Sequence, residues 1–173
     1  MIINFFSKFV FIGIGSNLWL GLRTPKDNVL EAIEYLKKLS DEPLQVSSLI
    51  ESKPFDCPPG SPDFVNAVVA LVPKKNETPL SFLYALQHIE NSMGRVRSGL
   101  KNEARIIDLD LLLFKAETNA SEELMLPHPE ILNRNFVLEP LQEIFHRECF
   151  KKDEFDSLIR FIKKTPPKKA ELS

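Results

Sequence analysis

The sequence predicts one domain of mixed α/β or α+β class, and two observations carry this prediction. Apolar, β-branched runs typical of strands alternate along the 173 residues with segments that carry one apolar helical face. The length suits a single hydrophobic core, and 43% apolar with 27% charged residues is ordinary for a globular protein. Because short apolar runs are ambiguous, the pattern alone does not choose between the two classes.

In the first half of the chain, strands flank one helix and one rigid loop. Asp27 is a suitable cap for the helix, whose apolar residues fall on one face. Four prolines forbid regular structure in the loop, which is therefore expected at the surface. The expected elements are a strand at 9–14 closed by Gly15-Ser16-Asn17, a helix at 27–39, a strand at 46–50, the proline-rich loop at 53–62 and a strand at 64–72.

The second half is expected to hold one helix, one mobile loop and one long strand. The loop reads GRVRSGLKNEA and is basic and poor in apolar residues. The expected elements are a helix at 80–93, the mobile loop at 94–104, a strand at 105–114, a rigid turn at 126–129 and a short closing segment after 135–141. Residues 1–162 are predicted to form the domain, and 163–173 a disordered tail or linker.

The bulk charge and the cysteines exclude several classes of protein. A formal net charge of −2 gives no general surface for nucleic acid, and no stretch has the length of a membrane span. Cys57 and Cys149 form neither a metal-binding spacing nor a disulfide framework, which predicts a reducing, cytoplasmic compartment. We therefore expect no nucleic-acid and no membrane partner.

The pair Asp108 and Asp110 lies inside the apolar run 106–113. Side chains alternate along a strand, so both carboxylates are predicted to share one face, with Cα atoms roughly 6.5–7 Å apart. Burying them unpaired is unfavourable, and Mg²⁺, which favours carboxylate and phosphate oxygens, would offset that penalty. The spacing fits equally well a strand edge on which both carboxylates are solvated or paired with arginines.

Arg95, Arg97 and Arg105 precede this pair. A guanidinium offers five donors in a planar fork that suits polyphosphate oxygens, and with a metal it could neutralise a transferring phosphoryl group. The alternative is that these arginines belong to a solvated basic loop. For a run of charged residues taken alone, this interpretation is favoured over phosphate binding.

Aromatic and amide side chains indicate a site for a flat heterocycle. Phe64 and Asn66 share one face of the expected strand, so a ring could stack beside an amide that reads its edge. Phe136 could supply a second wall, although core packing is the commoner role of a single Phe. His128, between two prolines, could donate to a phosphate or be an ordinary turn residue.

Several common catalytic motifs are missing from the sequence. There is no GxxxxGK[ST] loop, no GxGxxG after a strand and no nucleophile–base order that stands out. Any ATP site in this chain is therefore not of the P-loop type.

Taken together and in order, five blocks of sequence resemble the 6-hydroxymethyl-7,8-dihydropterin pyrophosphokinase family. The similarity extends over residues 9–145. The matching blocks are FIGIGSNL at 11–18, IESKP at 50–54 with PDFVNA at 62–67, Gln87 and Glu90 with GRVR at 94–97, RIIDLDLLLF at 105–114, and LPHP at 126–129 with NRNFVLEPL at 133–141.

The resemblance implies a role for each candidate residue. Asp108 and Asp110 would bind two Mg²⁺ ions that bridge the phosphates of ATP, and Arg95 and Arg105 would act catalytically from mobile loops. The pterin would be bound by Ser52, Phe55, Phe64, Asn66 and Phe136. The ATP site would be lined by Gln87, Glu90, Arg97, Leu111, His128 and Arg134.

The resemblance also implies a ferredoxin-like α+β sandwich, a monomer, and pyrophosphoryl transfer from ATP to the pterin hydroxymethyl group in folate synthesis. Three departures from the family pattern stand out. Asn102 replaces a common Trp, Ser52 replaces a common Thr, and Asp56-Cys57 brings a one-residue insertion in place of a glycine-containing turn. The first and last are expected to alter loop closure.

Three other readings remain open at this point. The chain could be a catalytically silent pterin- or nucleotide-binding module, which the retained carboxylates and arginines speak against. It could be another enzyme with a DxD motif, such as a sugar-nucleotide transferase, although Phe64, Asn66 and Phe136 favour a flat heterocycle. It could also be one module of a longer folate enzyme, with the Pro- and Lys-rich tail as a linker.

Overall fold

A computed structural model of the protein describes residues 5–165. A five-stranded antiparallel sheet in the order β2-β4-β1-β5, with β3 also paired to β4, lies at its centre. The sheet strands are β1 (Val10–Ser16), β2 (Gln45–Val46), β3 (Ile50–Ser52), β4 (Phe64–Leu71) and β5 (Asp108–Phe114). A two-stranded sheet joins β6 (Asn119–Ala120) to β7 (Met125–Leu126).

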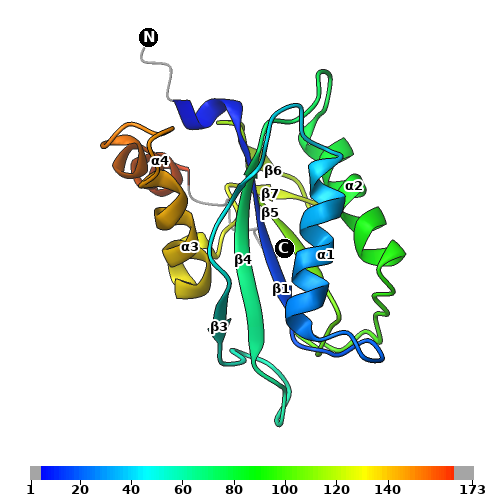
Figure 1. The fold of residues 1–173 in the computed structure, drawn as a ribbon. Helices are drawn as coiled ribbons and strands as arrows, with labels where there is room; N and C mark the ends of the chain where they lie inside the picture. Colours follow the sequence, from blue (N-terminus) through cyan, green and yellow to red (C-terminus); the bar gives the residue numbers. More distant parts are fainter. Residues whose placement is uncertain (1–4, 166–173) are drawn as a thin grey trace.

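Helices cover both faces of the central sheet, as Figure 1 shows. The α-helices are α1 (Pro25–Lys37), α2 (Pro79–Ser92), α3 (Asn135–Phe145) and α4 (Glu154–Lys164), and the 3₁₀ turns are η1 (Phe5–Lys8) and η2 (Ile131–Asn133). One core cluster joins α1 and α2 to the sheet, and a second, rich in phenylalanine, joins η1, α3 and α4 to the other face. The α+β sandwich expected from the resemblance is thus confirmed. None of the helices within residues 5–165 has the length and apolar character of a membrane span.

Helix α1 begins earlier than the sequence suggests. Thr24 is its N-cap, and Asp27, which was expected to cap the helix, is the third helical residue and completes a capping box with Thr24. Pro25 at the first helical position fixes the start, because its backbone is already suited to the first turn. Thr78, Pro79 and Ser81 form the same arrangement at the start of α2.

Strand β5 begins at Asp108, three residues later than expected. The reason lies in Asn17, which is buried and whose Oδ1 accepts a hydrogen bond from the backbone N–H of Arg105 at 2.8 Å. The backbone N–H groups of Asn17 and Leu18 donate to the carbonyl of Arg105 at 3.1 and 3.2 Å. These bonds take the place of a strand ladder there.

The C-terminal region is more helical than expected. Where a short closing segment was predicted there are two helices, and α4 continues to Lys164, two residues past the boundary placed after residue 162. Its buried residues Glu154, Leu158 and Ile162 recur every four positions and face the phenylalanine-rich cluster. The rest of the expected tail, residues 166–173, lies outside the described residues.

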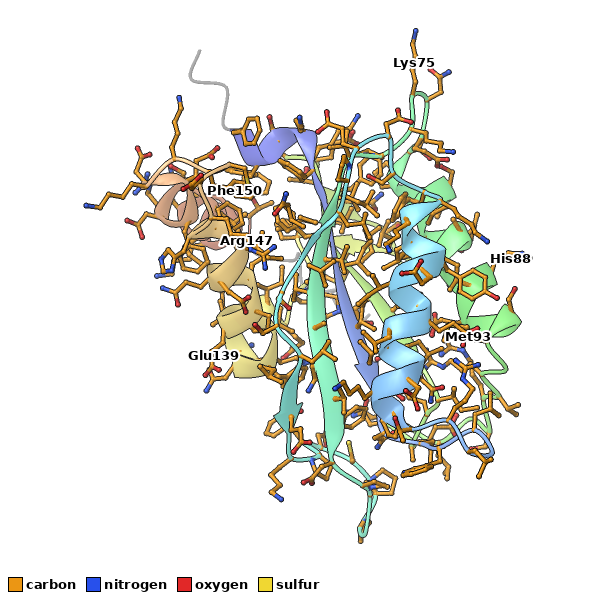
Figure 2. The ribbon with its side chains drawn as sticks, viewed as in Figure 1. Lys75, His88, Met93, Glu139, Arg147 and Phe150 are labelled. Atoms are coloured by element: carbon orange, nitrogen blue, oxygen red, sulfur yellow. The ribbon has the colours of Figure 1, made fainter. Side chains whose placement is uncertain are left out.

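Helix α3 is fastened to the edge of the sheet by polar contacts. Figure 2 shows Arg147 and Phe150 beside the α3–α4 connection, on the side that faces the strands. Arg147 donates to the Gln45 side chain at 3.2 Å and to the Val46 carbonyl, while Glu143 accepts from the Ser48 N–H at 2.9 Å. These contacts hold the C-terminal end of α3, whereas residues at its start, Arg134, Phe136 and Val137, line the candidate site.

Candidate active site

The register of the sheet brings the predicted polar residues into adjacent rows. Gly15 on the central strand β1 is paired with Asn66 on β4 and with Asp108 on β5, while Gly13 is paired with Asp110. Both carboxylates therefore lie on the face that α3 covers, with only glycines between them and β4. Because glycine has no Cβ, the floor of the site stays open between the amide and the carboxylates.

A cavity of about 290 Å³ lies over this floor. Its walls come from the strands, from the start of α3 and from two loops that are far apart in the sequence, the proline-rich loop (residues 53–62) and the arginine loop (residues 94–105). Nine of the predicted site residues line it, namely Ser52, Phe55, Phe64, Asn66, Arg105, Asp108, Asp110, Arg134 and Phe136. The structure thus places the predicted pterin residues and both carboxylates around one cavity.

Three arginines surround the two carboxylates. Arg95 donates to Asp108 at 2.8 Å, Arg105 Nε lies 3.7 Å from Asp108, and Arg134 lies 3.8 Å from Asp110. Burial, and next the neighbouring charge of Asp108, raise the pKa of Asp110 from 3.8 to about 7, although Arg134 opposes the shift. Because the ionised form of Asp110 is unfavourable here, a bound cation would stabilise it.

Glu90 lies behind the carboxylates rather than in the cavity. It is buried on α2 and forms an ion pair with the Arg95 side chain, which is only 7% exposed. Arg97 lies 3.7 Å from Glu90 and is 60% exposed. Glu90 therefore holds the guanidinium of Arg95 where it reaches Asp108.

Phe64, Asn66 and Phe136 also line the cavity, and we call the space between the two aromatic rings the slot. Asn66 donates to Ser52 Oγ at 2.7 Å, so Ser52 orients the amide and leaves Oδ1 toward the Gly15 floor. The guanidinium of Arg105 lies 5.3 Å from the centroid of the Phe64 ring, and that of Arg134 lies 5.8 Å from the centroid of the Phe136 ring. Each of these aromatic rings thus has an arginine guanidinium over it.

His128 lies next to the site but does not line the cavity. Its Nδ1 accepts a hydrogen bond from the Glu130 N–H at 3.1 Å, which leaves the ring proton on Nε2. Burial, followed by the charge of Arg134, lowers the pKa of His128 from 6.5 to about 4. The ring is therefore a neutral donor near pH 7.

The remaining predicted ATP residues are spread more widely. Gln87 is exposed on α2, and Leu111 is buried in the core cluster under α1 and α2. Arg95, Arg97, Glu90 and His128 also lie outside the cavity lining. The structure brings together the heterocycle side and the carboxylates, whereas of the predicted ATP residues only Arg134 lines the same cavity.

Several cavity residues were not singled out as candidates from the sequence. They are Gly13, Gly15, Lys53, Asp56, Cys57, Lys101, Asn102 and Glu130. A signal for the glycines exists, since they alternate with Ile12 and Ile14 and so share one face of an apolar strand. The loop residues give no such signal, because their position depends on contacts between distant segments.

Comparisons with known proteins agree with this geometry. Residues 11–146 match the family model described as 7,8-dihydro-6-hydroxymethylpterin-pyrophosphokinase (HPPK). A 2-amino-4-hydroxy-6-hydroxymethyldihydropteridine pyrophosphokinase of Haemophilus influenzae is 41% identical over 135 residues, which are 78% of this chain and 79% of that protein. The protein of the same name from Pseudomonas aeruginosa is 38% identical over 136 residues, with the same shares of 78% and 79%.

A longer relative matches as well. The folic acid synthesis protein fol1 of Pneumocystis carinii is 37% identical over 135 residues, which are 78% of this chain but only 17% of that protein. In that relative the matching region is a small part of a much longer chain. With a family model that matches most of its length and relatives at about 40% identity, this chain belongs to the 7,8-dihydro-6-hydroxymethylpterin-pyrophosphokinase family.

Proposed function

We propose that this chain transfers the pyrophosphoryl group of ATP to the hydroxymethyl group of 6-hydroxymethyl-7,8-dihydropterin, a step of folate synthesis, through the residues of this cavity. The products are AMP and the pterin diphosphate. The observation that carries the assignment to this site is that a slot with two aromatic walls and a carboxylate pair share one cavity. The family to which the chain belongs supports the same reaction.

The pterin would lie in the slot between Phe64 and Phe136. Stacking of a flat ring on an aromatic side chain stabilises both, and an amide can read the polar edge of the ring. Asn66 would accept from a ring N–H with the Oδ1 that faces the floor, and Ser52 would keep the amide in that orientation. Phe55, which is 74% exposed in the proline-rich loop, would cover the ring from outside.

Asp108 and Asp110 fit a site for two Mg²⁺ ions. They are oxygen ligands on one face of one strand, and the raised pKa of Asp110 is the signature of a carboxylate that lacks its compensating charge. The described residues hold no group of three or more His, Cys, Asp or Glu side chains for a metal, which suits a cation that takes its other ligands from phosphates and water. When bound, Mg²⁺ would supply positive charge against the phosphate oxygens.

ATP would lie beside this pair, along the arginine loop and α2. Arg95 and Arg105 would contact the phosphates, because both guanidinium groups are already within 4 Å of Asp108. Neutral His128 would donate from Nε2 to a phosphate oxygen, and Arg134 would add charge beside Asp110. Gln87, Arg97 and Leu111 would contribute to the nucleotide side, with Glu90 acting through Arg95.

In the transfer itself, the pterin hydroxyl oxygen forms a bond to the β-phosphorus, and the bond from that phosphorus to the oxygen bridging the α-phosphorus breaks. AMP leaves with the bridging oxygen, and the hydroxyl proton passes to solvent or a phosphate oxygen. The chain forms no covalent bond; it aligns the two substrates and donates hydrogen bonds to the charge that develops.

The remaining assignments follow from the same proposal. We also propose a monomer, as the resemblance to this family implies. Both cysteines are free, which suits a reducing, cytoplasmic compartment. We assign the catalytic domain to the predicted residues 1–162, extended to Lys164, where α4 ends.

Release of AMP from ATP tests the function. AMP is expected only when Mg²⁺ and 6-hydroxymethyl-7,8-dihydropterin are both present, together with an equal amount of pterin diphosphate. 6-Methyl-7,8-dihydropterin is the matched control, since it fits the same slot but has no hydroxyl to attack. Tight pterin binding without AMP would instead identify a silent binding module, and AMP formed without any pterin would identify a hydrolase.

A further inference from the structure

Asn17 is a buried amide at the point where the central strand β1 leaves the sheet. It follows Ser16, the last residue of β1, and is 1% exposed. Its Oδ1 accepts from the Arg105 N–H at 2.8 Å, and its Nδ2 donates to the Pro62 carbonyl at 3.2 Å. A backbone N–H only donates and a carbonyl only accepts, so the two partners fix the orientation of the amide. One side chain thus joins the segments that lead into both neighbours of β1, the strands β5 and β4.

The backbone of Arg105 is held at both of its polar groups. Its N–H donates to the Asn17 side chain, and its carbonyl accepts from the N–H groups of Asn17 and Leu18 at 3.1 and 3.2 Å. The carbonyl of Leu18 in turn accepts from the side chain of Asn28, a fully buried residue of α1, at 2.9 Å. The base of the Arg105 side chain is therefore fixed relative to a strand and a helix.

From this fixed backbone the guanidinium of Arg105 reaches both halves of the candidate active site. It lies over the ring of Phe64, 5.3 Å from the centroid, and its Nε lies 3.7 Å from a carboxylate oxygen of Asp108. This Nε is buried and has no hydrogen-bond partner among residues 5–165. The donor is therefore free for an oxygen of a transferring phosphoryl group, between the pterin slot and the carboxylates.

We propose that Asn17 is a positioning residue for pyrophosphoryl transfer, which fixes Arg105 between the pterin slot and Asp108. Asn17 does not line the cavity, so it acts through the backbone of Arg105 rather than on a substrate. The role rests on the proposed function, because it requires a phosphoryl group for Arg105 to contact. Misplacing a group by about 1 Å can slow a reaction about 100-fold, so a hydrogen bond behind Arg105 has a large effect on the rate.

A role in stability alone makes a different prediction. Loss of a buried hydrogen bond lowers stability wherever it occurs, but it changes the kcat of the folded protein only if a catalytic group moves. If Asn17 acts through Arg105, replacing it has no further effect once the guanidinium is gone. The kcat values of two single variants and their double variant therefore separate the two roles.

The first variant is Asn17→Ala, which removes both side-chain hydrogen bonds. In the folded variant the kcat for AMP release should fall roughly 10- to 30-fold. The KM for the pterin should change less than about threefold, because Phe64 is held by its strand pairing with Ser52. Arg105→Met keeps an aliphatic stem but no guanidinium, so its kcat should fall about 100-fold. The double variant should match Arg105→Met within about twofold, whereas independent losses would multiply to at least about 1000-fold.

Asn17→Asp is the conservative variant, since it keeps an acceptor for the Arg105 N–H and loses only the donor to Pro62. Its kcat should fall about threefold, which restores most of the loss in Asn17→Ala. If Asn17→Ala does not fold, Asn17→Asp takes its place in the double variant. Ser47→Ala is the control, because it removes a buried acceptor of the Val68 N–H, at 2.9 Å, outside the cavity lining. It should lower the Tm and leave kcat unchanged.

Two results would overturn the positioning role. One is a folded Asn17→Ala protein that keeps full kcat, as Ser47→Ala should. The other is a double variant whose loss is the product of the two single losses.

If the unaltered chain releases no AMP in the presence of the pterin, the proposed function fails instead. The same comparison is then made with the affinity for the Mg²⁺ complex of α,β-methylene-ATP, which keeps the phosphates but cannot transfer them. Asn17→Ala should weaken this binding several-fold only when Arg105 is present. Equal weakening in the Arg105→Met protein, or no binding of the complex to the unaltered chain, overturns the positioning role as well.

Discussion

The guanidinium of Arg95 donates a hydrogen bond of 2.8 Å to the carboxylate of Asp108. The same guanidinium pairs with Glu90, and both side chains are almost completely buried. Asp108 thus has a fixed positive partner before any metal arrives, whereas Asp110 faces only the more distant Arg134 at 3.8 Å. The two carboxylates are therefore not equivalent, and their variants should differ in stability.

Replacement of either carboxylate should remove most of the activity. We expect Asp108→Asn and Asp110→Asn each to lower turnover by at least about 100-fold, since a metal ion contributes several kcal/mol to stabilising the transferring group. AMP release at saturating ATP, Mg²⁺ and pterin measures the loss. Glu117→Gln, an exposed carboxylate beyond the far end of β5, is the control and should remain fully active. Normal turnover in either Asn variant would remove the metal assignment.

The contribution of Asp110 to the free energy of unfolding of the metal-free protein should fall as pH rises through the range set by its pKa. Its folded pKa of about 7 lies above the ordinary 3.8, so the folded protein binds the extra proton between these values. The contribution of this group is therefore greatest near pH 4, declines toward pH 7 and is lowest above it. Because the side chain is 35% exposed, we expect a decline on the order of 1 kcal/mol.

Denaturant unfolding at pH 5 and pH 8, with and without Mg²⁺, measures this effect. Asp110→Asn has no charge to bury, so it should be more stable than the unaltered protein at pH 8, by a margin that is smaller at pH 5. Added Mg²⁺ should stabilise the unaltered protein at pH 8 and have little effect on the variant. An unaltered protein that is more stable than Asp110→Asn at pH 8 without metal would contradict the assigned pKa.

Much of the site follows from strand periodicity. The two-residue period is enough to predict that Asp108 and Asp110 share a face, as do Phe64 and Asn66, and the structure has both pairs on the α3 side of the sheet. The period does not reveal that Gly15 separates Asn66 from Asp108, because register depends on pairing between strands that are about 50 and 90 residues apart.

The features that the sequence analysis did not predict also have physical explanations. The segment expected to lead into a short closing segment is the helix α3, which continues through Pro140 although proline lacks the N–H for an intrahelical hydrogen bond. Helix α4 carries apolar residues at helical spacing and could have been found by that period. The hydrogen bond between Asn102 and Asp56 could not have been predicted in this way, since a bond between two surface loops leaves no periodic pattern in either loop.

Replacement of Gly15 by Ala should leave the stability of the fold nearly unchanged but weaken binding of the pterin. A Cβ at this position would lie 3.4 Å from Asn66 Oδ1 and 3.6 Å from Phe64 Cδ1, which is ordinary contact. Gly15→Ala should therefore fold with a change in stability within about 1 kcal/mol. The methyl group would occupy the floor of the slot, so we expect the KM for the pterin to rise about tenfold, by the loss of roughly 1.4 kcal/mol of binding, with a smaller change in the KM for ATP.

Gly13→Ala provides the comparison. The nearest atoms to a Cβ there belong to the Leu112 side chain, at 3.5–3.7 Å, in the row that holds Asp110 rather than Asn66. Its effect on the KM for the pterin should be clearly smaller. Equal increases in both variants would mean that the slot does not lie over Gly15.

His128 should make the protein sensitive to mild acid. The unfolded chain protonates this ring near pH 6.5, whereas burial and Arg134 delay protonation in the folded protein to about pH 4. Between these values the unfolded state binds more protons, so stability is lost as pH falls from about 6.5 toward 4. We expect this ring to contribute a loss on the order of 1–2 kcal/mol at pH 5 relative to pH 7, equivalent to a fall in Tm of about 3–6 °C for a chain of this size.

His128→Asn isolates this contribution, because the Asn oxygen can accept the Glu130 N–H that Nδ1 accepts in the unaltered protein, and it does not titrate. The difference in Tm between pH 7 and pH 5 should shrink by most of the 3–6 °C in this variant. His88→Asn, at an exposed position on the outer side of α2 (Figure 2), should keep the full difference. If His128→Asn is as acid-sensitive as the unaltered protein, the ring is not held neutral, and it would reach the phosphates of ATP as a cation rather than as a neutral donor.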